Sequence, residues 1–219
     1  MVAVTRQLRV LLLATALLVL AVLTFNLVGG GDEDAQDGDS AAPAVPPQVM
    51  TAYVRAASRV VELSPGCAGM SWAILAGVGA IESRHAGNRT IETNGDISPQ
   101  IVGPRLDGSG VGGNVTPVAD TDGGSLDGDL EYDRAVGPMQ FLPETWGRWG
   151  RDGNEDGTSD PHNIFDSTLG AAAYLCGDAT VDLADRAQLS LAIGRYNNSA
   201  SYVADVLAYA DIYATSPGP

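Results

Sequence analysis

The sequence predicts a mainly α-helical domain with one long irregular insertion, preceded by an apolar N-terminal segment. Three observations support this prediction. Stretches with apolar residues at helical spacing recur between residues 49 and 213. Residues 86–132 are rich in Gly and Asp and show no such spacing. The run from Val10 to Val28 is almost entirely apolar and is long enough to span a bilayer, which takes about 20 residues.

Residues 1–28 are predicted to be a signal peptide or a transmembrane anchor. Arg6 and Arg9 precede the apolar run, and acidic residues 32–39 follow it. This order of charges places the N-terminus in the cytoplasm and the rest of the chain outside. No small-x-small cleavage site adjoins the run, which favours a retained anchor. Both options predict an exported domain in the cell envelope, at the outer face of the cytoplasmic membrane.

The charge balance limits the classes of partner. The chain carries 12 basic and 27 acidic residues, a net charge of −15, and every basic residue is Arg. Such a chain repels phosphates, so nucleic acid is excluded as a partner. Residues 29–47 are rich in Gly, Asp, Ala and Pro and are predicted to be a flexible linker. The folded domain is then expected to cover residues 48–219.

The two cysteines, Cys67 and Cys176, are expected to form a disulfide. An even pair in an exported chain favours a bridge. The alternative is two buried free thiols.

The most informative stretch is the apolar segment 72–83, which reads as a helix that ends on a carboxylate. Ser71, Leu75, Val78 and Glu82 share one face, so Glu82 continues an apolar stripe. A carboxyl group in an apolar wall has a raised pKa and can carry a proton near neutral pH. Such a group is a candidate general acid. The alternative is a helix-end Glu in water.

Five further helices are expected. The first covers residues 49–61, and the others cover 143–149, 167–176, 185–195 and a final stretch after Ser199 or Ser201. The apolar face of the first is predicted to comprise Met50, Tyr53, Val54, Ala57, Val60 and Val61. The insertion 86–132 is expected to be a loop or small flap beside Glu82, with short strands around Ile101-Val102.

Residues 152–158 resemble the first half of an EF-hand calcium loop. Asp152, Asn154 and Asp156 occupy its positions 1, 3 and 5, Gly157 is the turn glycine at position 6, and Thr158 offers a carbonyl at position 7. Position 12 is Asn rather than Glu, so a bidentate ligand would come from Asp160 or Asp166. The alternative is an acidic loop without metal. Asp120, Asp122, Asp127 and Asp129 are read as solvated turns that could also bind a cation, and His162 as a packing residue.

Two polar stretches are candidates for contact with a sugar. Gln140 lies in a Gly-Pro turn and offers both amide donors and an acceptor. Tyr196, Asn197 and Tyr202 lie between the last two predicted helices and could stack on a sugar or bond to it. The alternatives are a turn Gln that caps a helix and a polar connection between helices.

Four motifs in this order resemble lytic murein transglycosylase B and its relatives, a lysozyme-like family. They are Ile81-Glu82-Ser83, the segment from Gly137 to Pro143, Asp152-x-Asn154-x-Asp156-Gly157, and Tyr196-Asn197-x-Ser199-x-x-Tyr202. The resemblance covers about residues 48–213. The acidic insertion and the absence of Lys are similar to actinobacterial members. Residues 86–132 and Asn163 depart from the family pattern.

The resemblance implies a lysozyme-like fold and a lytic transglycosylase that cleaves the bond between N-acetylmuramic acid and N-acetylglucosamine in peptidoglycan. Glu82 would be the single acid/base. Ser83, Gln140, Tyr196, Asn197 and Tyr202 would contact substrate or support Glu82. The loop from Asp152 to Thr158 would hold a structural calcium ion, and no organic cofactor is implied.

Two alternatives to this function remain. One is a hydrolysing lysozyme with water as the acceptor, and the other is a non-catalytic cell-wall-binding module stabilised by calcium. Ordinary glycosidases use two carboxylates. A transglycosylase can use one, because the C6 hydroxyl of the muramic acid attacks its own anomeric carbon. The expected product is then a 1,6-anhydro sugar.

Overall fold

The computed structural model describes residues 42–216 and confirms the mainly helical class. The predicted signal or anchor segment and the linker up to residue 41 lie outside the described residues. Within 42–216, none of the helices combines the length and the apolar character needed to cross a membrane. The helices are α1 (Pro47–Leu63), α2 (Trp72–Ser83), α3 (Pro143–Trp149), α4 (Ile164–Cys176), α5 (Arg186–Tyr196) and α6 (Ala200–Thr215), with a 3-10 turn η1 (Val111–Gly113).

The strands are short and form three two-stranded sheets. Strand β1 (Cys67–Ala68) pairs in parallel with β6 (Val181–Asp182). The other two pairs are antiparallel: β2 (Thr90–Ile91) with β3 (Ile97–Ser98), and β4 (Val102–Arg105) with β5 (Arg134–Val136). The sheets therefore join segments that are distant in the chain but do not form a layer of their own.

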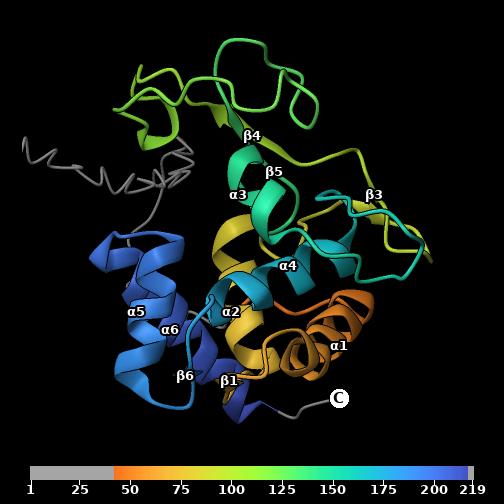
Figure 1. The fold of residues 1–219 in the computed structure, drawn as a ribbon, viewed down its shortest axis with the longest axis vertical. Helices are drawn as coiled ribbons and strands as arrows, with labels where there is room; N and C mark the ends of the chain where they lie inside the picture. Colours follow the sequence, from red (N-terminus) through yellow and green to blue (C-terminus); the bar gives the residue numbers. More distant parts are fainter. Residues whose placement is uncertain (1–41, 217–219) are drawn as a thin grey trace, which may run out of the picture.

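Helix α2 lies at the centre of the helical part, between α1 and α6 (Figure 1). The Ser71 side chain caps its N-terminus by accepting a hydrogen bond from the Ile74 N–H. All residues from Ala73 to Ala80 are buried, so the helix is enclosed on every side. The predicted apolar stripe is therefore only part of the buried surface. Small residues make the close packing possible, since a Cβ on Gly77 would lie 2.6 Å from the Val206 carbonyl oxygen of α6.

Helix α1 confirms the first predicted helix, but its predicted apolar face is partly wrong. The buried residues are Val49, Ala52, Tyr53, Ala56 and Val60, whereas Val61 is 47% exposed. The true stripe is shifted around the axis because α1 packs against both α2 and α4. Alanines on the α4 side allow this close contact, so the largest apolar side chains do not define the buried face.

Helix α4 begins three residues earlier than predicted, because Asn163 is its N-cap. The Asn163 Oδ1 atom accepts hydrogen bonds from the N–H groups of Phe165 at 3.0 Å and Asp166 at 3.5 Å. The helix is buried along almost its full length, and its small residues allow the approach of α1. Asn163 thus has a capping role at the position where an EF-hand loop would place its last ligand.

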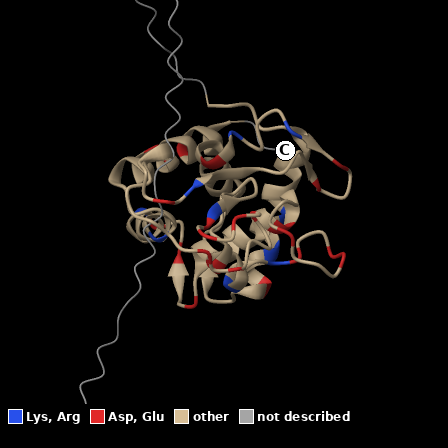
Figure 2. Ribbon diagram, turned by 90° about the horizontal axis from the view of Figure 1, so that it is seen from above, with Lys and Arg blue, Asp and Glu red and all other residues tan. Residues whose placement is uncertain are grey.

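The insertion 86–132 contains strands β2, β3 and β4. Its part around and after β4 lies at the top of Figure 1, whereas the β2–β3 pair lies beside the start of α4, where Asp96 pairs with Asn163. The predicted short strand is confirmed as β4, which pairs with β5. Asp129 is held by Arg105 at 2.8 Å and Arg134 at 3.3 Å. Acidic residues also outnumber basic ones over the loops of the molecule (Figure 2). The insertion is therefore ordered largely by carboxylates that bond to arginines and to backbone N–H groups.

The predicted Cys67–Cys176 disulfide is present, with the Cα atoms 5.4 Å apart. It joins β1, which directly precedes α2, to the last residue of α4. The bridge therefore ties the two most deeply buried helices together at one end.

We predict that removal of this disulfide destabilises the domain. The sequence separation is 109 residues, and the chain-entropy model gives about 4–5 kcal/mol for a loop of that size. Reductant should lower the midpoint of urea unfolding for the wild type but not for the double variant Cys67→Ser/Cys176→Ser. Titration of the unfolded, unreduced wild type should find no free thiol, and two free thiols would contradict the bridge.

Candidate active site

Glu82 lies in the last turn of α2 and receives a hydrogen bond from a buried tyrosine. The Tyr202 hydroxyl, on the first turn of α6, donates to Glu82 Oε1. Burial raises the pKa of Glu82 to about 8, and the hydrogen bond from Tyr202 opposes this shift because it stabilises the carboxylate. Glu82 as a residue is half-buried. This is the partly desolvated environment that the sequence predicts for a general acid.

Burial and the Tyr202 hydrogen bond are the causes of the shift in the pKa of Glu82, and no carboxylate is among them. A neighbouring anionic Asp or Glu would raise the pKa of Glu82 further by charge repulsion, yet burial and Tyr202 alone account for the shift. Asp129, Asp211 and Asp166, elsewhere in the fold, bond to arginines or to backbone N–H groups. Among the hydrogen bonds of residues 42–216, the side chain of Glu82 is joined to Tyr202 and to no other acid.

The chain makes a strained turn directly after Glu82. Arg84, His85, Ala86 and Gly87 all have positive φ angles, at 52°, 59°, 68° and 56°. The left-handed region costs a residue other than glycine about 1–3 kcal/mol, and such strain persists only where surrounding contacts enforce it. The Ser83 hydroxyl supports the turn by accepting the Ala86 N–H at 2.9 Å. Ser83, predicted to support Glu82 or a sugar, therefore bonds to the turn that follows Glu82.

Gln140 lies in the predicted Gly-Pro turn, between β5 and α3. Its Nε2 atom donates to the Gly137 carbonyl at 2.9 Å, and its backbone is left-handed, with φ 49°. The residues on either side of it, Met139 and Phe141, are buried, whereas Gln140 is half-buried. Glycine at position 103 lets Gln140 Oε1 lie against β4, since a Cβ there would be 2.8 Å from that oxygen. Gln140 is therefore the one polar side chain that this turn exposes.

The predicted sugar-contact residues of the α5–α6 connection serve other partners. Tyr196 is 1% exposed, and its hydroxyl donates to the Met139 carbonyl at 2.5 Å. Asn197 is 3% exposed and accepts the Ser199 N–H at 3.0 Å. The Tyr202 ring is buried as well. Their contacts support a structural role, in which Tyr196 joins the Gln140 turn to the core and Tyr202 bonds to Glu82.

The candidate calcium loop is organised by its own backbone N–H groups. Asp152 accepts the N–H groups of Glu155, Asp156 and Gly157 at 2.6, 3.2 and 2.8 Å. Asn154 Nδ2 lies 2.8 Å from Asp156 Oδ2, so two predicted ligand side chains are adjacent. Carboxylate, amide and carbonyl oxygens are the donors that calcium takes. The donor set of Asp152, Asn154, Asp156 and Thr158 therefore fits a calcium ion, and its binding stays a prediction.

Asp166 has a role that differs from the direct ligation predicted for it. It is buried in the first turn of α4. Its carboxylate accepts the N–H groups of Gly153 at 2.7 Å, Asn154 at 3.1 Å and Asp160 at 2.9 Å. Asp160, the other proposed bidentate ligand, accepts the His162 N–H. Asp166 therefore anchors the loop to α4 from inside the protein.

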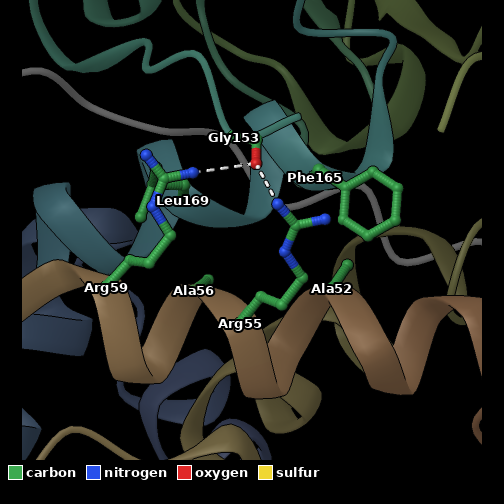
Figure 3. Close-up of a pocket in the computed structure, with 7 residues that line it drawn as sticks. All are labelled: Ala52, Arg55, Ala56, Arg59, Gly153, Phe165 and Leu169. Atoms are coloured by element: carbon green, nitrogen blue, oxygen red, sulfur yellow. Dashed lines mark hydrogen bonds between the residues drawn. The ribbon is translucent and has the colours of Figure 1, made fainter. Parts of the chain in front are cut away.

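Two arginines of α1 hold the same loop from the other side. Arg55 and Arg59 both donate to the Gly153 carbonyl, at 3.2 and 3.0 Å, in the pocket drawn in Figure 3. Arg59 also pairs with Glu155 at 3.2 Å. The Arg55 guanidinium lies over the Phe165 ring, 4.9 Å from its centre. None of the predicted substrate-binding residues lines this pocket. The two arginines fix the loop on α1.

A second acidic group lies in the insertion. Carboxylate oxygens of Asp120, Asp122 and Asp133 come within 4.8 Å of one another. Asp120 Oδ1 accepts the N–H groups of the next turn, and Asp133 is bonded to Thr121 through both oxygens. These bonds match the predicted turns. The addition of Asp133, which directly precedes β5, is the part that the sequence did not reveal. His162, predicted to pack, is buried and lies 3.2 Å from the Leu126 carbonyl.

One buried histidine, in the turn after Glu82, was not among the residues predicted from the sequence. His85 is 1% exposed and lies between two tyrosine hydroxyls, Tyr53 at 2.9 Å and Tyr213 at 2.8 Å. Burial lowers its pKa to about 4, so the ring is neutral at pH 7. The only sequence signal for it was its position three residues after Glu82, since the two tyrosines come from α1 and α6.

We predict that Glu82→Gln stabilises the domain increasingly as pH rises from about 4.5 to 8. The folded protein holds the Glu82 proton up to its raised pKa, whereas the unfolded chain releases it near 4.5. Wild-type stability therefore falls through this window, and the Gln variant lacks this loss. Melting temperatures of both proteins at pH 4.5, 6 and 8 give the difference. Glu144→Gln, at an exposed position, is the control, and a pH-independent difference would contradict the raised pKa.

We predict separate roles for Asp152 and Asp166. Asp166→Ala leaves three N–H groups without their acceptor and should lower the free energy of unfolding by about 3 kcal/mol or more, with calcium or with chelator. Asp152→Ala should remove the increase in melting temperature that calcium gives to the wild type, because a ligand stabilises the state that binds it.

Thermal melts of the three proteins in calcium and in chelator test both roles. A wild type that melts at the same temperature in both buffers would contradict the calcium site. An Asp166→Ala variant as stable as the wild type would contradict the anchoring role.

No protein-family model matches this chain. No curated protein matches it either. Two solved structures are similar to it, both of the Escherichia coli lytic transglycosylase Slt35, one in complex with calcium and the other with bulgecin A. Each is 15% identical to this chain, with 78% of this chain and 75% of that chain covered and a TM-score of 0.45.

Proposed function

We propose that this protein is an exported peptidoglycan lytic transglycosylase of lysozyme-like fold, with Glu82 as its single general acid and base. The observation that carries the proposal is the state of the Glu82 carboxyl. It is desolvated, its pKa is raised to about 8, and its one side-chain hydrogen bond comes from Tyr202. A carboxyl group that is protonated at neutral pH is suited to protonate a leaving oxygen.

The solitary position of Glu82 favours transglycosylation. A two-carboxylate glycosidase needs a second acid about 5–9 Å away, whereas the side chain of Glu82 is bonded to Tyr202 and no second carboxylate contributes to its pKa. In the proposed reaction Glu82 gives its proton to the glycosidic oxygen as the bond to the anomeric carbon breaks. Glu82, now a carboxylate, takes the proton of the C6 hydroxyl as that oxygen bonds to the same carbon. The 1,6-anhydro ring forms without a water molecule.

Tyr202 contributes to both halves of this reaction. Its hydrogen bond favours the carboxylate, whereas burial favours the acid, so the two effects offset each other. The result is a pKa close to physiological pH, where one group can give a proton and then recover it. Gln140, exposed from its rigid turn, is the proposed amide contact to the glycan.

The remaining parts of the proposal concern location and stability. The N-terminal apolar segment would hold the domain at the outer face of the membrane, within reach of glycan strands. A calcium ion held by Asp152, Asn154, Asp156 and Thr158 would stabilise the loop and take no part in the chemistry. The chain's own bonds from Asp166, Arg55 and Arg59 fix that loop on α4 and α1.

We predict that Glu82→Gln abolishes glycan cleavage while the domain stays folded. The amide keeps the shape of the side chain but cannot transfer the proton in either half-reaction, and general acid–base catalysis contributes about 10²–10⁴-fold. Purified peptidoglycan is digested and the products are weighed by mass spectrometry. Wild type and Glu144→Gln should release 1,6-anhydromuramic ends, and Glu82→Gln should release almost none.

The products also separate the alternatives. Products that are heavier by one water would place the wild type among hydrolysing lysozymes. Binding to peptidoglycan without cleavage would place it among wall-binding modules. Near wild-type turnover by Glu82→Gln would show that another group is the acid.

A further inference from the structure

A chain of hydrogen-bonded side chains crosses the core next to Glu82. Its members are Tyr53 of α1, His85 of the left-handed turn and Tyr213 of α6, and it ends on the Pro43 carbonyl. Tyr53 and His85 are each 1% exposed and Tyr213 is 5% exposed. Three polar side chains in an apolar core are costly unless each is bonded, so the geometry of this chain is tightly specified.

The direction of each of these three hydrogen bonds follows from the last acceptor, the Pro43 carbonyl. The Pro43 carbonyl can only accept, so the Tyr213 hydroxyl donates to it at 2.7 Å. Tyr213 therefore accepts from His85 Nε2–H at 2.8 Å. In the neutral ring Nδ1 is then an acceptor, and the Tyr53 hydroxyl donates to it at 2.9 Å. One tautomer of His85 satisfies both tyrosines, and the ring is held on both sides.

The same histidine belongs to the strained turn that ends α2. His85 N–H bonds back to the Gly79 carbonyl at 2.9 Å, and Arg84 N–H bonds to the Ala80 carbonyl at 3.2 Å. The bond from Arg84 closes α2 in an αL-type cap, but Arg, His and Ala occupy the turn, where glycine is the residue that fits a positive φ. Local backbone preference opposes this conformation, so a contact from elsewhere must enforce it.

Gly79 of α2 leaves the space for that contact. A Cβ on Gly79 would lie 2.0 Å from the Tyr53 hydroxyl oxygen, so only glycine lets this hydroxyl pass α2 and reach His85. The turn begins two residues after Glu82. Helix α6 supplies partners to both residues, Tyr202 to Glu82 and Tyr213 to His85.

We propose that Tyr53 and His85 are positioning residues, which hold the left-handed turn so that the Glu82 carboxyl stays within reach of the Tyr202 hydroxyl. The catalytic part of this inference rests on the proposed function. We call the hydrogen bond between Tyr53 and His85 the clamp. Without it, the turn relaxes toward right-handed backbone, the last turn of α2 loosens, and Glu82 becomes more solvated. A displaced acid loses alignment with the bond it protonates, and small misplacements of this kind are known to cost up to about 100-fold in rate.

The test uses Tyr53→Phe, which removes one hydroxyl and keeps the ring. The matched control is Tyr209→Phe, since Tyr209 stacks on Tyr213 but its hydroxyl bonds to no residue between 42 and 216. Cleavage of soluble glycan chains is measured well below the melting temperature of each variant. Tyr53→Phe should lower kcat about tenfold or more with little change in KM, and Tyr209→Phe should match the wild type.

Two further readouts separate positioning from general stability. In carbon-13 NMR of Glu carboxyl groups, with the Glu82 signal assigned by its loss in Glu82→Gln, Tyr53→Phe should move the Glu82 titration from about 8 toward 4.5. Adding Arg84→Gly relieves one strained position. The double variant Tyr53→Phe/Arg84→Gly should therefore recover most of the lost kcat.

Wild-type kcat and an unmoved titration in Tyr53→Phe would overturn the proposal, whatever happens to the melting temperature. A double variant that is no more active than Tyr53→Phe would show that the clamp does not act through the turn. A wild type that cleaves no glycan would overturn the proposed function instead, and the titration would still decide whether the clamp positions Glu82.

Discussion

The close approach of α2 to its neighbours is the constraint on which the rest of the structure depends. Glycines at positions 77 and 79 leave room for the Val206 carbonyl of α6 and the Tyr53 hydroxyl of α1. Because α6 lies this close, Tyr202 near its start reaches Glu82 and Tyr213 near its end reaches His85. A methyl group at either glycine would force the helices apart and separate Glu82 from the groups that set its chemistry.

Desolvation in this packed region acts on its polar groups in opposite directions. It raises the pKa of Glu82 and lowers that of His85, so both groups are neutral at pH 7. A neutral Glu82 can give a proton, and a neutral His85 can accept from one tyrosine while it donates to the other. The apolar core thus sets the protonation state of the acid as well as the geometry of the turn behind it.

An acidic chain can organise its own loops without many cations. Asp152, Asp166 and Asp120 each accept several backbone N–H groups, which fixes the loop backbone at a short distance in sequence. Arginines are used where a loop must be joined to another element, as with Arg59 on the 152–158 loop and Arg105 in the insertion. These bonds, all made by the chain itself, define the loops.

The sequence alone determined the helices, the disulfide, the β4 strand and the apolar surroundings of Glu82, because each depends on local spacing or on a residue pair with one available partner. It could not determine which face of α1 is buried, or the roles of Tyr196, Asn197 and Tyr202. Those depend on which elements pack together, and the same tyrosine can stack on a sugar or fill a core. The left-handed turn at His85 was decided only by tertiary structure, since hydroxyls from two distant helices hold a backbone conformation that the residues of the turn disfavour.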